Sequence, residues 1–275
     1  MDNAVFSPWL ARWKLLPDGA ATTTHTSQLL PVTVAASGAK AMLKITHDVD
    51  EQRGNRLMAW WQGEGAAAVI AQHNEAILLA RAGDSSSLTV LSQRGRDDEA
   101  CRILCRTANR LHASTARPLP QLTPLDVWFS PLMPAAQKYG GFLTRSAEFA
   151  QSLLSTPRDV VALHGDLHHD NVLDFGASGW LAIDPKALIG ERGFDFANIF
   201  TNPDLGYPEP RVAVVAEIFK QRLATVSEAA SLDKTRLLQW IVAWCGLSAT
   251  WLLEDNEPTA TVSAVAKLAL AELEG

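Results

Sequence analysis

Three polar residues in the middle of the chain have types and a spacing that suit phosphoryl transfer. Four residues separate Asp166 from Asn171, and Asp184 follows after the next apolar run. Phosphoryl transfer needs a carboxylate that orients the attacking hydroxyl and oxygen ligands for the Mg²⁺ that neutralises charge on the phosphates. We therefore predict that Asp166 is the orienting group or general base, and that Asn171 and Asp184 are Mg²⁺ ligands.

Two short apolar runs, residues 160–163 and 180–183, flank these polar residues and read as buried strands. Polar groups at the ends of buried strands are held in fixed positions, and many active sites are built in this way. The same residues would also suit ordinary turns that cap the strand ends. That alternative leaves Asp184, at the end of the second run, without an explanation.

A lysine and a glutamate nearer the amino terminus form the second candidate group. Lys44 lies in a predicted strand over residues 40–46, where side chains alternate between two faces. A lysine on a buried strand requires an anionic partner. In the kinase pattern such a lysine pairs with nucleotide phosphates and with a glutamate on the following helix. The helix predicted over residues 48–62 carries Glu51 in its first turn, so we predict Glu51 as that partner. An acidic residue at this position would also complement the helix dipole without any further role.

The order of these residues, Lys44, Glu51, Asp166, Asn171 and Asp184, is that of a protein-kinase-like phosphotransferase. The run H-G-D-L-H-H-D-N closely resembles the catalytic loop of aminoglycoside phosphotransferases. More narrowly, nearly the whole chain resembles the aminoglycoside/hydroxyurea antibiotic resistance kinase family, whose best-known members are streptomycin 6-phosphotransferases. The stretches that carry this resemblance are residues 51–54, 80–83, 111–114, 118–120, 164–171, 179–185 and 244–251.

The resemblance implies an enzyme that uses ATP and Mg²⁺ to move the γ-phosphate to a hydroxyl of a small molecule, most readily an aminoglycoside such as streptomycin. It also implies that Lys44, held by Glu51, contacts the nucleotide phosphates. A kinase of a sugar-like metabolite, with no role in resistance, remains an open alternative. The chain departs from the kinase pattern at residues 22–28, where hydroxyl side chains replace a glycine-rich loop, and at Pro185, which replaces Phe-Gly after the metal-binding Asp.

The predicted elements indicate an α+β, two-lobed protein-kinase-like fold. We expect an N-lobe over residues 1–82, with a small antiparallel sheet and one main helix, and a mostly helical C-lobe over residues 83–275. Residues 81–87 are small and polar and are the best hinge candidate. Asp195 suits a helix N-cap, whereas in the resembling family an Asp here braces the catalytic loop. The C-lobe helices are expected over residues 97–113, 135–154, 212–224, 232–253 and 259–273.

Composition limits the classes of partner. A net charge of −6 and a pI near 5.6 argue against a nucleic-acid surface. No stretch approaches ~18 to 20 uninterrupted apolar residues, so we predict no membrane span. The three cysteines are an odd number in a long chain and do not suggest a disulfide framework. We therefore expect a cytoplasmic protein that acts on a small hydroxylated substrate; the sequence does not indicate an oligomeric state.

Two other functional classes can be weighed against the kinase. One alternative is a hydrolase that binds zinc or iron through the side chains of His164, Asp166, His168, His169 and Asp170. Adjacent histidines point apart in an extended segment, and a hydrolase would leave Lys44 and Glu51 without a role. A kinase-like binding module without turnover is the other alternative, and the missing glycine-rich loop is its only support.

Overall fold

A twisted antiparallel sheet forms the amino-terminal lobe in a computed structural model, which describes residues 3–83, 86–113, 117–207 and 209–275. The register of β3 against β4 places Leu29 opposite Lys44, and a turn at Gly38, whose φ of +70° favours glycine, joins these two strands. The strand order is β1 (Leu15–Pro17), β3 (Ser27–Val34), β4 (Lys40–Thr46), β6 (Ala76–Ala80) and β5 (Val69–His73), with β2 (Thr22–Thr23) beside β3.

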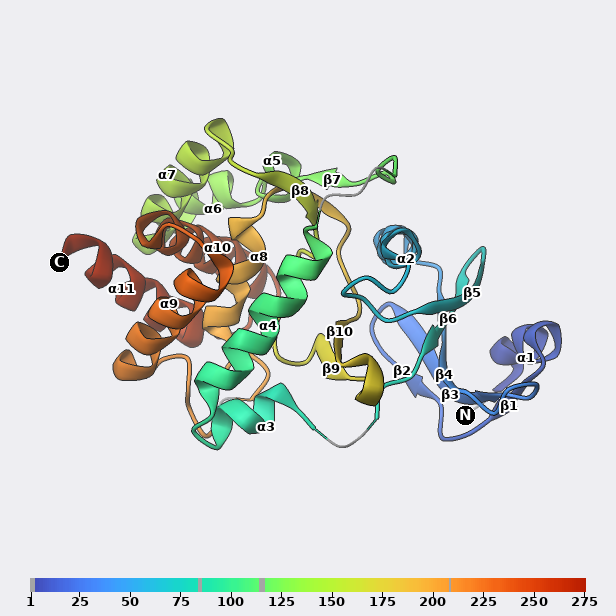
Figure 1. The fold of residues 1–275 in the computed structure, drawn as a ribbon. Coiled ribbons are helices and arrows are strands. Elements are labelled where there is room, and N and C mark those ends of the chain that lie inside the picture. The colour runs from blue at the N-terminus through green and yellow to red at the C-terminus, as the bar shows by residue number, and fades with distance from the viewer. Residues whose placement is uncertain (1–2, 84–85, 114–116, 208) are drawn as a thin grey trace.

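Two helices of this lobe, counted over the described residues, lie on opposite sides of the sheet (Figure 1). They pack into different cores. The short helix α1 (Ser7–Trp13) follows a 3-10 turn (Asn3–Phe6) and buries Trp9 against strands β3 and β4. The main helix α2 (Val49–Trp61) buries Leu57, Met58 and Trp61 in the core that continues into the second lobe. Asp48 caps α2, because its carboxylate accepts the backbone N–H groups of the first turn.

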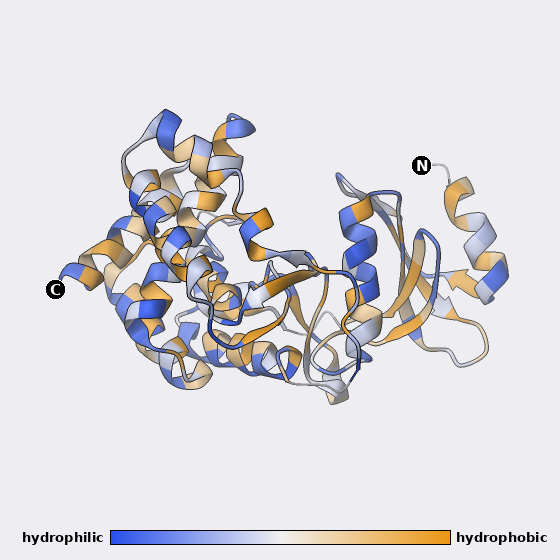
Figure 2. Cartoon of the chain, turned by 90° about the horizontal axis from the view of Figure 1, so that it is seen from above, coloured by the Kyte–Doolittle hydropathy of each residue, from blue (hydrophilic) through white to orange (hydrophobic). Residues whose placement is uncertain are grey.

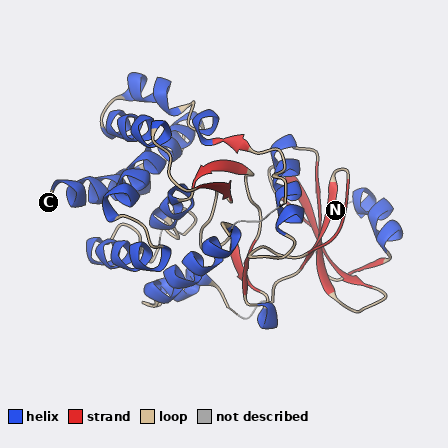
Figure 3. Cartoon of the chain, turned by 45° about the horizontal axis from the view of Figure 1, so that its top comes forward, coloured by secondary structure: helices blue, strands red, loops and turns tan. Residues whose placement is uncertain are grey.

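The second lobe is mostly helical, and its strands are short (Figure 3). The long helix α10 lies at its centre and packs against α7, α8 and α11, with Trp240, Trp244 and Leu247 buried. The predicted α+β, two-lobed fold is therefore confirmed. The helices are α3 (Leu88–Gln93), α4 (Asp97–Leu111), α5 (Leu125–Trp128), α6 (Leu132–Tyr139), α7 (Phe142–Ser155), α8 (Gly193–Ala197), α9 (Ala216–Ala230), α10 (Lys234–Glu254) and α11 (Ala260–Glu274), with 3-10 turns at Gly176–Ser178 and Asn198–Thr201.

Two of the expected C-lobe helices differ from their predicted bounds by more than two residues. The single helix predicted over residues 135–154 is broken into α6 and α7, because Gly140 and Gly141 both have a positive φ. Helix α9 begins later and ends later than residues 212–224. The carboxylate of Asp204 accepts the N–H groups of Val212 and Val214, which holds the backbone there outside the helix.

The two apolar runs that flank the central polar residues are strands, as predicted, but they pair in different sheets. The first run is β8 (Val160–Leu163), which pairs with β11 (Leu188–Glu191) in a sheet that also contains β7 (Thr123–Pro124). The second run contains β10 (Trp180–Ala182), which forms a hairpin with β9 (Val172–Asp174). The loop between β8 and β9 is thereby anchored to a strand at each end.

Backbone hydrogen bonds join the two lobes directly. Ala67 N–H donates to the carbonyl of Ala182, and Ala182 N–H donates to the carbonyl of Gly65. The predicted hinge is described in part, since Asp84 and Ser85 lie outside the described residues, as does Ser114 in one of the stretches that carry the family resemblance. The lobe boundary between residues 82 and 83 stays a prediction.

Among the described residues, α10 is long and apolar enough to cross a membrane by length and composition alone. Its apolar window is 72% buried inside the lobe, so the helix packs against other helices. Figure 2 shows that the strands of the amino-terminal sheet are largely hydrophobic, whereas the helices carry both hydrophilic and hydrophobic residues.

Candidate active site

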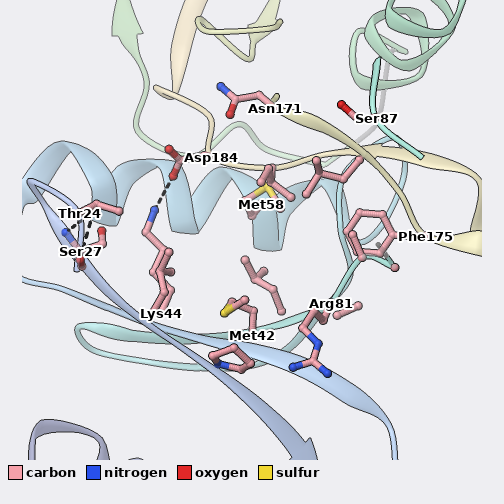
Figure 4. Close-up of a pocket in the computed structure, with 18 of the residues that line it drawn as sticks. Thr24, Ser27, Met42, Lys44, Met58, Arg81, Ser87, Asn171, Phe175 and Asp184 are labelled. Carbon is pink, nitrogen blue, oxygen red and sulfur yellow. Dashed lines mark hydrogen bonds and ion pairs between the residues drawn. The ribbon is translucent and has the colours of Figure 1, made fainter. Parts of the chain in front are cut away.

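A cleft of about 1520 Å³ lies between the lobes, and both lobes contribute to its walls. Figure 4 shows Lys44 reaching from its strand toward Asp184, with Asn171 beyond them. The five residues predicted from sequence come together around this cleft. Lys44, Glu51, Asn171 and Asp184 line it directly, and Asp166 is hydrogen-bonded to the side chain of Asn171.

Lys44 is buried, and its ammonium group pairs with two carboxylates. Its Nζ forms hydrogen-bonded ion pairs with Glu51 Oε2 on α2 and with Asp184 Oδ1 beyond β10. The side chains of Lys44 and Glu51 are 9% and 10% exposed, so water screens this pair weakly. The lysine on the buried strand therefore has the anionic partner that its position demands.

A second lysine, Lys186, approaches the same two carboxylates. Its Nζ lies 3.2 Å from Glu51 Oε1 and 3.9 Å from Asp184 Oδ2. Burial on its own would raise the pKa of Asp184, but the two ammonium groups outweigh this effect and hold the pKa of that carboxyl below its usual value. Asp184 is therefore ionised at neutral pH and is available to a cation.

Asp166 is held at both carboxylate oxygens by amide groups. Asn198 Nδ2 donates to Asp166 Oδ1 at 2.8 Å, and Asn171 Nδ2 donates to Asp166 Oδ2 at 3.2 Å. Asn171 Nδ2 also donates to the Asp166 carbonyl at 2.8 Å, so its amide oxygen is left for another ligand. Asn198 is fixed in turn, because its Oδ1 accepts hydrogen bonds from Thr201 and Asn202.

The loop that carries Asp166 is braced from below by Asp195. The carboxylate of Asp195 accepts the N–H groups of His164 at 2.9 Å and Gly165 at 2.7 Å, and it contacts His112 Nε2 at 2.8 Å. It makes no cap for α8, so the bracing alternative is the one that the structure supports. Burial would raise the pKa of Asp195, but His112 and the backbone donors lower it overall.

The imidazoles of the central loop point to different partners. His164 Nδ1 accepts the Asp166 N–H, so the proton of this ring lies on Nε2, which donates to the Ile183 carbonyl at 2.8 Å. Burial lowers the pKa of His164 and keeps the ring neutral. His168 accepts the Asp170 N–H, and His169 is buried. Among the described residues no group of three His, Cys, Asp or Glu side chains could hold a metal, so the geometry does not support the hydrolase alternative.

A hydroxyl-rich turn lies at the position where kinases have a glycine-rich loop. The turn joins β2 to β3 through residues 24–26. These residues and Ser27, the first residue of β3, line the cleft. The turn is closed by its own hydrogen bonds, since Thr24 N–H donates to the Ser27 carbonyl at 2.8 Å and Ser27 N–H donates to Thr24 Oγ1 at 3.1 Å.

The far end of the cleft is apolar and suits a flat ring. Met42, Leu79 and Phe175 line it from both lobes (Figure 4). On the segment after β6, Arg81 N–H donates to Lys40 and Gly83 N–H donates to Asp174. The N–H of Ala82 between them has no partner in the described part of the chain, so it is free to donate to a ligand.

Sequence reasoning missed two residues of this site, Lys186 and Asn198. A signal existed for Lys186, because it follows Asp184 by two positions. Asn198 carried no signal, since it reads as the end of a short helix and meets Asp166 through a hydrogen bond that spans 32 positions.

Comparison with known proteins gives matches over almost the whole chain. Residues 12–256 match the family model described as aminoglycoside/hydroxyurea antibiotic resistance kinase. A streptomycin 3''-kinase of Klebsiella pneumoniae is 49% identical over 247 residues, which are 90% of this chain and 92% of that protein. A streptomycin 6-kinase of Streptomyces griseus is 30% identical over 276 residues, covering 95% of this chain and 85% of that protein.

A solved structure shows the same fold at low sequence identity. The crystal structure of the aminoglycoside phosphotransferase APH(4)-Ia superposes with a TM-score of 0.67 over 99% of this chain and 98% of that one, at 12% identity. The two-lobed architecture is therefore shared well beyond the range in which the sequences resemble each other.

Proposed function

The chain belongs to the aminoglycoside/hydroxyurea antibiotic resistance kinase family, and from this premise we propose that it transfers the γ-phosphoryl group of Mg-ATP to a hydroxyl of an aminoglycoside, with streptomycin as the first candidate. The names of the two relatives described above support streptomycin as the acceptor. We further propose that the enzyme acts in the cytoplasm and that its lobes meet between residues 82 and 83.

One observation carries the proposal. A carboxylate whose two oxygens are oriented by amides, Asp166, lies beside an amide and a carboxylate that can bind a cation, Asn171 and Asp184. Across the cleft, Lys44 and Glu51 form a buried ion pair at the phosphate end. Phosphoryl transfer relies on this kind of positioning and charge stabilisation, because the protein has little covalent chemistry to perform.

The residues present fit a magnesium ion that is shared with a nucleotide. Mg²⁺ in kinases is bound through one or two carboxylates or amides together with phosphate oxygens and water, so a protein site of three acidic or imidazole ligands is not required. Asp184 is 39% exposed at its side chain and already attracts two ammonium groups, which occupy the position of a cation. When bound, Mg-ATP would supply the phosphoryl group and neutralise the charge that develops on it.

The residues of the chain then have separate tasks. Asp166 orients the acceptor hydroxyl and accepts its proton as the oxygen attacks the γ-phosphorus. Asn171 and Asp184 would hold the metal, and Lys44, positioned by Glu51, would contact the nucleotide phosphates. The turn at residues 24–27 lines the cleft and would cover the phosphates in place of a glycine-rich loop, and Ala82 N–H would donate to the adenine ring.

The first test is a coupled assay of ADP release with Mg²⁺ over streptomycin, other aminoglycosides, hydroxyurea and simple sugars. We expect turnover with streptomycin. We also expect Asp166→Asn to lower turnover by about a hundredfold or more while Mg-ADP binding is retained, since an orienting base contributes roughly that much. Asp126→Asn, an exposed carboxylate on α5 outside the cleft, should leave turnover unchanged.

Turnover with a simple sugar but with no aminoglycoside would replace the substrate and keep the mechanism. Full activity of Asp166→Asn would contradict the roles assigned here. Phosphorus NMR of the product then assigns the phosphorylated hydroxyl, because the names of the two relatives specify different positions.

A further inference from the structure

Four charged side chains form a closed cluster at the phosphate end of the cleft. Lys44 bonds to Glu51 Oε2 and Asp184 Oδ1, while Lys186 lies 3.2 Å from Glu51 Oε1 and 3.9 Å from Asp184 Oδ2. Each carboxylate thus faces Lys44 with one oxygen and Lys186 with the other. Two positive and two negative charges balance, so the cluster is neutral before any ligand binds.

The backbone places Lys186 directly beside the catalytic loop. Lys186 N–H donates to the His164 carbonyl at 2.7 Å. A Cβ at Gly165 would lie only 3.1 Å from the Cβ of Lys186, so the two segments are in close contact. Lys44 reaches the cluster from the N-lobe sheet. Lys186 reaches it from the C-lobe, where it packs beside Gly165, the residue before Asp166.

A cation on Asp184 changes the balance of this cluster. With a divalent ion bound there, both ammonium groups would be repelled and would lose their shared carboxylate. Lys44 and Lys186 are then left with Glu51 alone, which gives a net charge of +1 on these three side chains. Both lysines need a new anion, and the phosphates of a nucleotide are the anions that share that metal.

The two lysines cannot serve the same phosphate equally. The group being transferred has to lie near Asp166, because Asp166 orients the hydroxyl that attacks it. The backbone of Lys186 contacts that loop. Its ammonium group pairs with Glu51 Oε1, whereas Lys44 comes from β4 and pairs with Glu51 Oε2. Because Lys186 is attached to the segment that packs against the Asp166 loop, we infer that it is the lysine placed for the transferred group.

We propose that Lys186 is a catalytic residue that binds the γ-phosphate and stabilises the phosphoryl group during transfer, while Lys44 binds the phosphates that remain with ADP. This inference rests on the proposed function and adds a second phosphate-binding lysine to it. In the transfer, the bond from the acceptor oxygen to the γ-phosphorus forms as the bond to the β,γ-bridging oxygen breaks. The bridging oxygen keeps the electron pair and leaves with ADP, and the hydroxyl proton passes to Asp166. Lys186 keeps its protons and contributes charge only.

A purely structural role for Lys186, as a counter-ion for the buried Glu51, makes different predictions. Loss of such a counter-ion would disturb Glu51 and hence Lys44, so it would weaken binding of every nucleotide to the same degree. A contact with the γ-phosphate affects only ligands that carry this group. Comparison of ADP with a non-hydrolysable ATP analogue therefore separates the two roles without any acceptor.

The experiment measures binding of Mg-ADP and Mg-AMP-PNP by calorimetry to the wild-type chain and to Lys186→Met. We expect AMP-PNP binding to weaken about tenfold or more and ADP binding to change less than about twofold, since a charge-assisted contact contributes roughly 1.5–3 kcal/mol. Lys44→Met should weaken both ligands. Lys186→Arg should retain part of the preference for AMP-PNP, because it keeps the positive charge. Lys267→Met, on the exposed side of α11, is the matched control and should change neither.

Equal weakening of both nucleotides, or no weakening of either, would overturn the proposal. Lys186→Gln serves as the second variant if the Met variant does not fold, because an amide can still donate a hydrogen bond to Glu51 without the charge. If Lys186→Met weakens AMP-PNP binding as expected but the wild-type protein phosphorylates no aminoglycoside, the proposed substrate is refuted and the role of Lys186 is retained.

Discussion

At the scale of single residues, the orientation of Asp166 depends on two amides that come from different parts of the chain. Asn171 is part of the same loop, but Asn198 lies at the end of α8 and contacts Asp166 Oδ1 at 2.8 Å. With each oxygen holding an amide hydrogen, the plane of the carboxylate is fixed relative to the cleft. Such positioning matters because small displacements of a reacting group cost large factors in rate.

We predict that Asn198→Ala lowers kcat by roughly ten- to hundredfold while KM for ATP and for the acceptor stays within about twofold. The reason is that Asp166 loses one of its two orienting donors but no substrate contact is removed. Steady-state kinetics with both substrates give the split between kcat and KM. Asn256→Ala, an exposed residue beyond α10, is the control. An increase in KM alone, or an unchanged kcat, would show that Asn198 does not position Asp166.

At the scale of elements, helix α2 is placed by its direct contact with the segment after β10. A Cβ at Gly54 would lie 2.2 Å from the Pro185 carbonyl oxygen, so only glycine allows this approach. Gly54 lies one turn beyond Glu51 on the same helix. The contact therefore holds Glu51 within reach of both Lys44 and Lys186.

We predict that Gly54→Ala lowers both kcat and nucleotide affinity, because the added methyl group must push α2 away from Pro185 and so displaces Glu51. Overpacking of this kind also costs about 1–3 kcal/mol of stability. Titration with Mg-AMP-PNP and thermal unfolding measure the two effects. Arg56→Ala tests the same helix on its exposed face, where no change is expected. Wild-type affinity in Gly54→Ala would show that the position of α2 does not depend on this contact.

At the scale of the whole molecule, a buried ion pair links the outer helices to the active site. Arg222 on α9 donates to both carboxylate oxygens of Asp97 on α4, at 2.6 and 3.0 Å, and its Nη1 donates to the carbonyls of Ile199 and Asn202. Those carbonyls belong to the segment that carries Asn198. The packing of α4 against α9 thus supports the residue that orients Asp166.

This pair also makes stability depend on pH. Burial would raise the pKa of Asp97, but Arg222 and Ser92 outweigh it and hold the pKa of this carboxyl below its usual value. A carboxyl whose pKa is lowered by folding stabilises the fold at any pH above its pKa in the unfolded chain. This stabilisation is lost as the pH falls through its pKa in the folded protein. We therefore predict that urea unfolding shows a loss of stability below about pH 4, and that Asp97→Asn is less stable at pH 7 but loses less on acidification.

Removal of one partner should be more damaging than removal of both. Arg222→Met leaves Asp97 buried without its counter-charge, for which we expect a cost of ~3–5 kcal/mol. The double variant Arg222→Met with Asp97→Leu should recover part of this loss. If the single and double variants were equally unstable, the ion pair would contribute nothing beyond the packing of its two side chains.

The sequence by itself determined the family, the lobe order and the five residues Lys44, Glu51, Asp166, Asn171 and Asp184 as candidates. The family follows from the resemblance along nearly the whole chain, and the five residues follow from local patterns that match the kinase order. Strand alternation puts a lysine on a buried face, the first turn of the next helix offers an acidic residue, and the loop between two apolar runs has a spacing typical of kinases. Helix bounds were less well predicted where glycine pairs or a distant carboxylate determine the backbone, as at residues 140–141 and 212–215.

Only the tertiary structure decided which further residues join the site. Lys186 meets Glu51 across 135 positions, and Asn198 meets Asp166 across 32. It also decided that Asp195 braces the loop and does not cap a helix. Contacts of this kind depend on how α2, β10 and α8 pack in three dimensions, and neither propensity nor periodicity along the chain carries that information.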